Sequence, residues 1–258
     1  MGIRKIMNFQ ENYSTINREE RNLSAIFFLA LCKHNNIYRF LDCFSSQKNI
    51  GSDFGIYFEY SFLRDLWNTI NDNQIKKEII RQYLIINNID DILRNPIIEI
   101  NRIFGVPTLT LSETKIVSPA NWSMRYYNDH FRDDDDFLEV CRFKWSFRIK
   151  PDIVIHLDKF HAICIEEKLE SMESWYPRGS DRKIFYSRGL PFVGQLELQK
   201  YMMEDLLGIE TEFLLLTNRQ KRINTHKIVS WKEIFNCLDL SDLPNFAKEV
   251  INRVCYNE

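Results

Sequence analysis

The sequence of 258 residues predicts an α/β protein in which helices flank a mixed central sheet. Residues 149–170 (IKPDIVIHLDKFHAICIEEKLE) hold two apolar runs around the turn signal Asp158-Lys159, which is the pattern of a β-hairpin. Residues 210–217 form another apolar run, and apolar residues recur at helical spacing within 14–42. The formal net charge of −2 excludes a chain that is basic throughout, so any nucleic-acid binding must come from local basic patches.

The N-terminal half is predicted to be mainly helical. The first helix is expected over 14–42, with Glu20 near its positive end. Residues 56–100 also have a helical pattern, which we interpret as an all-helical insertion beside the sheet. Periodicity fades over 105–136, where we expect a long loop.

The run Asp133–Asp136 ends this loop and has two interpretations. A cation site needs ligands that converge on one ion, whereas these four are adjacent in sequence. We therefore prefer a solvated acidic loop.

The C-terminal half is predicted to complete the sheet. Residues 137–147 alternate between apolar and polar positions and are interpreted as a strand that leads into the hairpin. A loop rich in charge and aromatics follows, and then a helix over 191–208 that ends at a glycine. A short strand is expected at 226–230 and a closing helix at 243–254. We treat residues 1–258 as a single domain.

The cellular setting is inferred from two features. The N-terminal residues contain no apolar segment of the kind found in secretion signals, and no apolar run is long enough to span a bilayer. The six cysteines show no close pairing and most lie among apolar residues, which favours buried free thiols over disulfides or a zinc site. We expect a cytoplasmic protein with no membrane partner.

Ionisable residues mark the ends of the predicted hairpin strands. Asp152 opens the first strand directly after Pro151, and Glu166 and Lys168 close the second. Because side chains alternate along a strand, Glu166 and Lys168 share one face and Glu167 points to the other.

This arrangement suits phosphodiester hydrolysis. A divalent metal held by carboxylates lowers the pKa of bound water and neutralises the scissile phosphate. Asp152 and Glu166 are candidate ligands, the main-chain carbonyl of Glu167 is a third, and Mg²⁺ (or Mn²⁺) fits so few protein ligands. Lys168 is then placed to hold the attacking water or to stabilise charge on the phosphate.

The sequence Pro151-Asp152, followed after a strand and turn by Glu166-Glu167-Lys168, resembles the signature of the PD-(D/E)XK nuclease superfamily, the restriction-endonuclease-like fold. The resemblance implies a core of helix, three strands, helix and strand, which we match to 14–42, 137–168, 191–208 and 211–217. It also implies that Asp152 and Glu166 are metal ligands and that Lys168 is the catalytic lysine. It covers about half of the chain, and residues 43–136 match nothing in the family.

Two outer residues follow from the same resemblance. Many members place an acidic residue on the first helix, and Glu20 is the better candidate here, with Glu19 second. Some members carry a glutamine on the helix after the motif, which points to Gln195 or Gln199. The form with tyrosine four residues after the glutamine is absent, because Glu197 stands four residues before Tyr201.

Two basic patches favour a polyanionic partner. The first mixes cations with aromatic side chains, a combination that suits phosphate contact and base stacking. Its residues are Arg178, Arg182, Lys183 and Arg188, interleaved with Trp175, Tyr176, Phe185 and Tyr186. The second contains Arg219, Lys221, Arg222, His226 and Lys227. Either can also be an ordinary solvated surface loop.

These features predict a metal-dependent nuclease, with DNA as the expected substrate in a restriction or defence role. One alternative is a catalytically silent nuclease-fold protein that binds nucleic acid or a partner. Another is an interaction protein whose insertion, 56–100, docks a partner. In a purely structural interpretation, Asp152 is a turn residue and Glu166 and Lys168 form an ion pair. A homodimer is possible.

Overall fold

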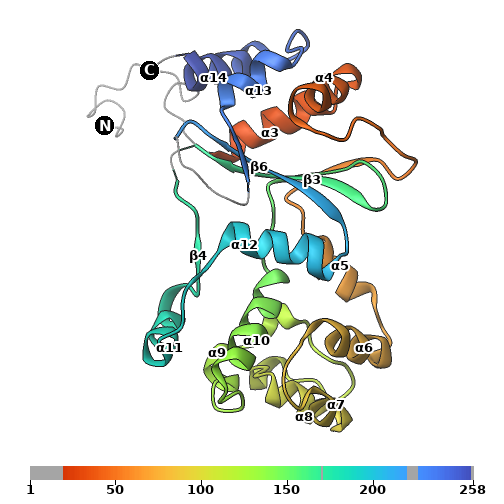
Figure 1. Cartoon of the computed structure of the whole chain (residues 1–258), viewed down its shortest axis with the longest axis vertical. Coiled ribbons are helices and arrows are strands. Elements are labelled where there is room, and N and C mark those ends of the chain that lie inside the picture. The colour runs from red at the N-terminus through yellow and green to blue at the C-terminus, as the bar shows by residue number, and fades with distance from the viewer. Residues whose placement is uncertain (1–19, 170, 220–225, 257–258) are drawn as a thin grey trace, which may run out of the picture. The chain divides into compact units, whose positions relative to one another are not determined.

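The structure is a computed structural model that describes residues 20–169, 171–219 and 226–256 (Figure 1). The chain divides into two compact units, each built from separate segments. The first contains the described residues up to Phe58, then Asp152–Met172, then those from Glu212 onward. The second contains Glu59–Pro151 and Glu173–Thr211. A single domain was predicted from the sequence, whereas the chain divides into these two compact units.

A mixed sheet of five strands lies at the centre of the first unit and bears out the predicted α/β class. The order is β1-β2-β3-β6-β7, with β1 paired antiparallel to β2, β2 antiparallel to β3, and β6 parallel to β7. The predicted hairpin and the predicted strand 210–217 are confirmed. The strands are β1 (Gly55–Phe58), β2 (Ile153–His156), β3 (His161–Lys168), β6 (Glu210–Thr217) and β7 (Lys227–Val229).

Four helices pack against one face of this sheet (Figure 1). They are α3 (Glu20–Leu31), α4 (His34–Phe44), α13 (Trp231–Cys237) and α14 (Asn245–Tyr256). Alternate strand residues such as Ile155 and Ile165 are fully buried beneath them, and Phe27 meets Trp231 and Phe235 edge-on. The core of the unit therefore lies between α3, α13 and the sheet, as period-2 burial in the strands requires.

The first predicted helix is two helices. The break follows Leu31, and Lys33 has an extended backbone (φ −69°, ψ 126°) before α4 begins. Residues 14–19 lie outside the described part of the chain. The closing helix is confirmed, but α13 was missed although Ser230 and Glu233 form a capping box at its start.

The largest error concerns residues 137–147, which form a helix and not a strand. Helix α10 spans Asp134–Ser146. Phe137, Val140 and Lys144 are buried at helical spacing, while Cys141 and Phe143 are buried as well. Because both faces are largely buried, apolar residues fall at alternating positions too, and the period-2 pattern misled the prediction. The strand expected before the hairpin is instead β1, whose residues were predicted to begin the helical insertion.

The second unit is mainly helical, which agrees with the helical pattern of 56–100 from Phe62 onward. Its first helices are α5 (Phe62–Thr69), α6 (Asn73–Tyr83), α7 (Ile89–Arg94) and α8 (Ile97–Ile103). The predicted loop 105–136 contains short helical turns at Thr108–Thr110 and Pro119–Asn121, and α9 (Met124–Tyr127). Phe104 stacks on Trp122 with ring centroids 4.1 Å apart, so aromatic packing orders this region despite its lack of periodicity.

The run of aspartates has a local structural role. Asp133 is the N-cap of α10 and accepts hydrogen bonds from the backbone N–H groups of Asp135 and Asp136. The other three acids occupy the first turn, where the helix dipole favours negative charge. This agrees with the preference against a cation site, but the segment begins a helix and is not a loop.

The second segment of this unit, Glu173–Thr211, is also more ordered than expected. Strands β4 (Trp175–Tyr176) and β5 (Val193–Gly194) pair, and α11 (Arg182–Arg188) lies between them in sequence. The predicted helix 191–208 begins at Gln195 as α12 (Gln195–Lys200) and continues as a π-helix over Tyr201–Leu206. Val193 and Gly194, which the prediction placed in the helix, instead pair with β4.

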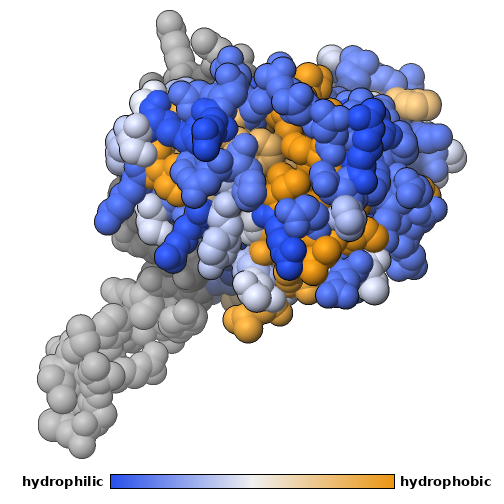
Figure 2. All heavy atoms as spheres, turned by 90° about the horizontal axis from the view of Figure 1, so that it is seen from below, coloured by the Kyte–Doolittle hydropathy of each residue, from blue (hydrophilic) through white to orange (hydrophobic). Residues whose placement is uncertain are grey.

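The surface combines polar and apolar side chains. Figure 2 shows hydrophobic side chains gathered in the middle of a largely hydrophilic face. Among the described helices, none is both long and apolar enough to cross a membrane. The six cysteines are free, as expected, but only Cys141 and Cys164 are fully buried, while Cys32 and Cys43 are exposed.

Candidate functional site

The antiparallel pairing of β2 and β3 brings the start of one strand to the end of the other. Asp152 immediately precedes β2, and Glu166 and Lys168 are in the last three residues of β3. The Oδ2 atom of Asp152 accepts a hydrogen bond of 2.8 Å from the backbone N–H of Glu167. The structure therefore places Asp152 beside Glu166 and Lys168 at one edge of the sheet, within the first unit.

Glu166 and Lys168 form a close ion pair on one face of β3. The Lys168 Nζ atom lies 2.5 Å from Glu166 Oε1, and the side chains are 13% and 1% exposed. Burial alone would lower the pKa of Lys168, but the charge and hydrogen bond of Glu166 and the charge of Asp152 raise it above its ordinary value. These acids therefore favour the ammonium form of Lys168, which suits charge stabilisation.

Glu20 joins the cluster from the first turn of α3. Its Oε2 atom accepts hydrogen bonds of 2.8 Å from the Leu169 N–H and from the Ser171 hydroxyl. Its Oε1 atom lies 3.7 Å from Lys168 Nζ. The helix acid expected from the family resemblance thus reaches the hairpin end, while the second candidate, Glu19, lies outside the described residues.

The negative charge of the cluster exceeds its positive charge. Asp152, Glu166 and Glu20 surround the single ammonium of Lys168. Burial, together with the charge of Glu166, raises the pKa of Asp152, although the Glu167 N–H and Lys168 oppose the shift. Two carboxyl groups that repel each other in a half-buried site are stabilised by an added cation.

Glu167 points away from this cluster. It shares the strand face of Ile163 and Ile165, is 0% exposed, and neither carboxylate oxygen has a hydrogen-bond partner among the described groups. Burial raises its pKa well above the ordinary range, with the charge of Asp152 adding to the shift and the nearby Ser24 hydroxyl opposing it. Its side chain is therefore a neutral core group, and only its main chain remains as a candidate ligand.

The donor set fits magnesium with few protein ligands. Within residues 20–169, 171–219 and 226–256, no three side chains of His, Cys, Asp or Glu are grouped to hold a metal. Two carboxylates, Asp152 and Glu166, with water and substrate oxygens are sufficient for Mg²⁺, which usually keeps several waters. The raised pKa of Asp152 beside Glu166 is the observation that fits a cation here.

The other predicted site residues belong to the second unit. Gln195 begins α12 and is half-buried, and Gln199 is buried further along the same helix. Neither residue is placed relative to the hairpin cluster, because the two units are described independently.

The first basic patch is an exposed arm made of β4, α11 and β5. Arg178 lies 4.8 Å from the Tyr176 ring centroid and Arg182 lies 5.6 Å from that of Phe192. Lys183 is exposed on α11, and the rings of Trp175 and Tyr186 are 48% and 70% exposed. Cations and exposed rings therefore share this arm, which we call the α11 arm (Trp175–Gly194).

Arg188 has a different role from the rest of the patch. Its guanidinium forms an ion pair of 2.7 Å with Asp134, donates to the carbonyls of Asn128 and Phe131, and lies 4.0 Å from the Phe137 ring centroid. These contacts tie α11 to the start of α10. We therefore correct the assignment of Arg188 and leave it out of the nucleic-acid interface.

The second basic patch is only partly described. Arg219 is exposed just after β6, whereas Lys221 and Arg222 lie outside the described residues. His226 is buried beside Phe213, with ring centroids 5.0 Å apart, so it is not a surface contact.

Two groups at the site were not predicted. The Ser171 hydroxyl donates to Glu20, and the Trp231 indole Nε1 donates to the Lys168 carbonyl at 3.3 Å. Trp231 begins α13 after a recognisable capping box, so the helix start was visible in the sequence, but its contact with β3 was not.

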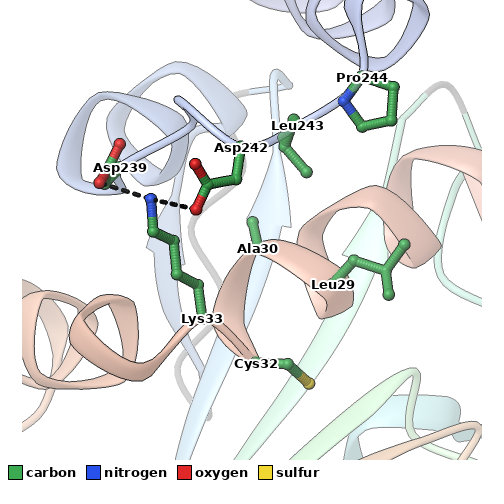
Figure 3. A pocket seen from close by; sticks show the side chains of 8 residues that line it. All are labelled: Leu29, Ala30, Cys32, Lys33, Asp239, Asp242, Leu243 and Pro244. Atoms are coloured by element: carbon green, nitrogen blue, oxygen red, sulfur yellow. Dashed lines mark hydrogen bonds and ion pairs between the residues drawn. The ribbon is translucent and has the colours of Figure 1, made fainter.

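A separate cavity of about 390 Å³ lies in the first unit beside α3 (Figure 3). Lys33 at its wall pairs with Asp239 at 2.6 Å and Asp242 at 2.9 Å. Two carboxylates thus compensate the lysine charge, and the pair ties the α3–α4 junction to the loop before α14.

Comparison of the chain with protein-family models, with curated proteins and with solved structures gave no match.

Proposed function

We propose that the protein is a metal-dependent nuclease that hydrolyses phosphodiester bonds, with DNA as its substrate. The observation that supports this most strongly is the cluster at the end of the hairpin. Three acids from separate segments, Asp152, Glu166 and Glu20, surround Lys168 at one sheet edge. A structural ion pair accounts for Glu166 and Lys168 but gives no reason for Asp152 to be held against Glu166 at an energetic cost.

The order of elements along the chain supports a restriction-endonuclease-like fold. Along the chain, α3 comes before β1, β2 and β3, and these come before α12 and β6. Helix α4 lies between α3 and β1, helices α5 to α10 lie between β1 and β2, and β4, α11 and β5 lie between β3 and α12. This is the order of helix, three strands, helix and strand that the resemblance implies, with Gly55–Phe58 as the first strand in place of 137–147.

The proposed chemistry divides among the residues of the cluster. Asp152 and Glu166 would hold Mg²⁺ or Mn²⁺ together with the main-chain carbonyl of Glu167, and the bound metal would lower the pKa of water and neutralise phosphate charge. Lys168, held as an ammonium, stabilises negative charge that develops on the phosphate. Glu20, on α3, would help to position the Lys168 ammonium through their ion pair of 3.7 Å.

The α11 arm is the proposed nucleic-acid contact. Arg178, Arg182 and Lys183 supply cations for phosphates, and the exposed rings supply surfaces for unpaired bases. Exposed Arg219 after β6 is a further candidate.

Nicking of supercoiled plasmid DNA, with Mg²⁺ or Mn²⁺ added, tests the proposal. The wild type and Lys159→Ala, a control in the exposed turn of the same hairpin, are expected to nick DNA. Glu166→Gln and Lys168→Ala are expected to lose at least about a hundredfold in rate, since each removes a group that stabilises the transition state. A parallel RNA substrate checks the choice of DNA.

Two outcomes would contradict the proposal. Activity retained in both Glu166→Gln and Lys168→Ala would remove the site assignment. Binding of nucleic acid that is insensitive to EDTA, with no cleavage of either substrate, would favour a catalytically silent binding protein.

A further inference from the structure

The helical unit contains a polar cavity of about 300 Å³ that the proposed nuclease chemistry does not use. Its wall is formed by α5, α6 and the segment 110–121, which all belong to the second unit. Polar side chains from both sides line it: Asn68, Asn71, Ser112 and Asn121. Two lysines, Lys76 and Lys115, also line this one space, which we call the Lys76 cavity.

Lys76 is the unusual residue of this cavity. It is 6% exposed, and its Nζ atom has a long hydrogen bond of 3.4 Å to the Ile116 carbonyl. The ammonium also lies 5.3 Å from the Trp67 ring centroid. Among the described residues, no Asp or Glu forms an ion pair with Lys76, so a carbonyl oxygen and an aromatic face are its observed partners.

Comparison with Lys33 shows why the burial of the Lys76 ammonium is unfavourable in free energy. That lysine, at the wall of the other cavity, is paired with two aspartates (Figure 3). A buried ammonium without a carboxylate bears a desolvation cost that a carbonyl and a ring offset only in part. Burial lowers the pKa of Lys76, and the positive charge of Lys115 lowers it further. An anion bound beside Lys76 would favour its charged form and so offset both effects.

Two residues of the cavity wall, Trp67 and Ser118, carry buried donors that lack a partner among the described groups. The Trp67 indole Nε1 and the Ser118 hydroxyl are buried without a hydrogen bond to any described group. Trp67 itself is only 2% exposed. A buried donor left unpaired costs about 1–3 kcal/mol, so packing alone does not satisfy the polar groups of this wall.

We infer that the Lys76 cavity binds a small anion that carries a phosphate group, with Lys76 and Lys115 as its countercharges. A phosphate can carry two negative charges, which match the two lysines, and several acceptor oxygens, which match the hydroxyl and amide donors around them. Ile70 and Val117 add apolar side chains to the same wall, and an organic part of the ligand would pack against them. This site is separate from the hairpin cluster and extends beyond the proposed nuclease function.

Thermal unfolding and calorimetry of the full chain test the inference. The probes are inorganic phosphate, adenosine monophosphate and succinate, all in EDTA and in a Lys168→Ala background so that the hairpin site does not contribute. Phosphate-bearing probes are expected to raise the Tm of the protein, and succinate is not. Stabilisation by the monophosphate alone would identify a phosphorylated organic ligand, whereas equal stabilisation would identify free phosphate as sufficient.

Lys76→Met is the decisive variant, and Lys77→Met is its matched control. Lys77 is the next residue on α6, but its Nζ atom donates to the Leu93 carbonyl at 2.5 Å and does not line the cavity. We expect Lys76→Met to weaken the Kd for the phosphate probe by at least about tenfold, the loss of one charge-assisted hydrogen bond, and Lys77→Met to bind normally. Circular dichroism checks that both variants fold, and Lys115→Gln gives a second test at an exposed position.

Three results would overturn the inference. They are no stabilisation of the wild type by either phosphate probe, equal stabilisation by succinate, and phosphate binding by Lys76→Met that matches the control. A variant that loses nicking but still binds phosphate, or that loses phosphate binding but still nicks DNA, separates this site from the proposed nuclease site.

Discussion

Lys168 shows how individual charges define the candidate site. It is the positive centre of the hairpin cluster, and its pKa stays above the ordinary value because Glu166, Asp152 and Glu20 outweigh its burial. The position of its ammonium is set by two acids, one two residues away and the other on α3. Residues that orient Lys168 should therefore influence catalysis without contacting the substrate.

Glu20→Gln tests this positioning role. The amide can still accept from the Leu169 N–H but no longer attracts the ammonium, so Lys168 is held less firmly. We expect kcat for nicking to fall about tenfold, roughly 1.4 kcal/mol in the barrier, with KM changed much less. Glu249→Gln, an exposed acid on α14, is the control. A change confined to KM would place Glu20 in substrate binding instead.

Asp152→Asn tests the energetic cost of the site. The folded state raises the pKa of Asp152, so the folded protein holds its proton more tightly than the unfolded chain does. The contribution of Asp152 to the free energy of unfolding is therefore most favourable at acidic pH, and it falls as pH rises from about 4 through the raised pKa of this carboxyl. Asp152→Asn removes this loss. We expect its free energy of unfolding to exceed that of the wild type by about 1–3 kcal/mol at pH 7.5 and to equal it at pH 4.

Asp158→Asn, in the same hairpin, is a control for which we expect the opposite change in the free energy of unfolding. The backbone N–H of Phe160 and the side chain of His161 lower the pKa of Asp158, so its charged form stabilises the fold. This variant should be destabilised at pH 7.5 and match the wild type at low pH, as measured by urea unfolding. If Asp152→Asn were destabilised in the same way, the carboxyl repulsion would not exist.

At the scale of elements, local sequence patterns predicted some helices correctly and failed to predict others. The closing helix and the hairpin were predicted because their apolar periodicity is unambiguous. Helix α10 was predicted as a strand because Cys141, Phe143 and Trp145 alternate with more polar residues, although Phe137, Val140 and Cys141 are buried at helical spacing. A cap at its start was visible in the sequence as the run of aspartates, but the run was interpreted as a loop.

Asp133→Ala tests the start of α10. The Asp133 carboxylate accepts from two backbone N–H groups that have no partner within the helix, and alanine leaves them unsatisfied. We expect a loss of about 1 kcal/mol in the free energy of unfolding, from urea denaturation. Asp129→Ala, exposed in the preceding turn, should be neutral. Equal effects of the two variants would mean that the cap is not formed.

The α11 arm is tested by its salt dependence. The double variant Arg182→Ala, Lys183→Ala removes two exposed cations and should weaken single-stranded DNA binding at every sequence. The slope of log K against log salt should fall by about 1–2, because fewer counterions are released. Binding is measured by fluorescence anisotropy in EDTA, with Lys232→Ala, on α13, as the control. An unchanged slope would exclude the arm from the interface.

At the scale of the whole chain, the division into two units was not predictable. The hairpin, from Asp152, returns to the sheet after the segment Glu59–Pro151 has formed part of another unit. Strand β1 is only four residues long, and Tyr57 and Phe58 are 47% and 36% exposed, so its local pattern is weak. It becomes a strand because β2 offers a partner with register Phe58↔Ile153.

The sequence by itself determined the hairpin, its turn and the strand face shared by Glu166 and Lys168, because these follow from the alternation of side chains over a few residues. Only the tertiary structure decided that Glu20 reaches Lys168. It also decided that, among the described residues, the buried Glu167 carboxylate has no hydrogen-bond partner and Lys76 lines a polar cavity with no acid paired to it. Burial and charge pairing depend on groups far apart in sequence. Such contacts form when long segments close on one another, and no local periodicity encodes them.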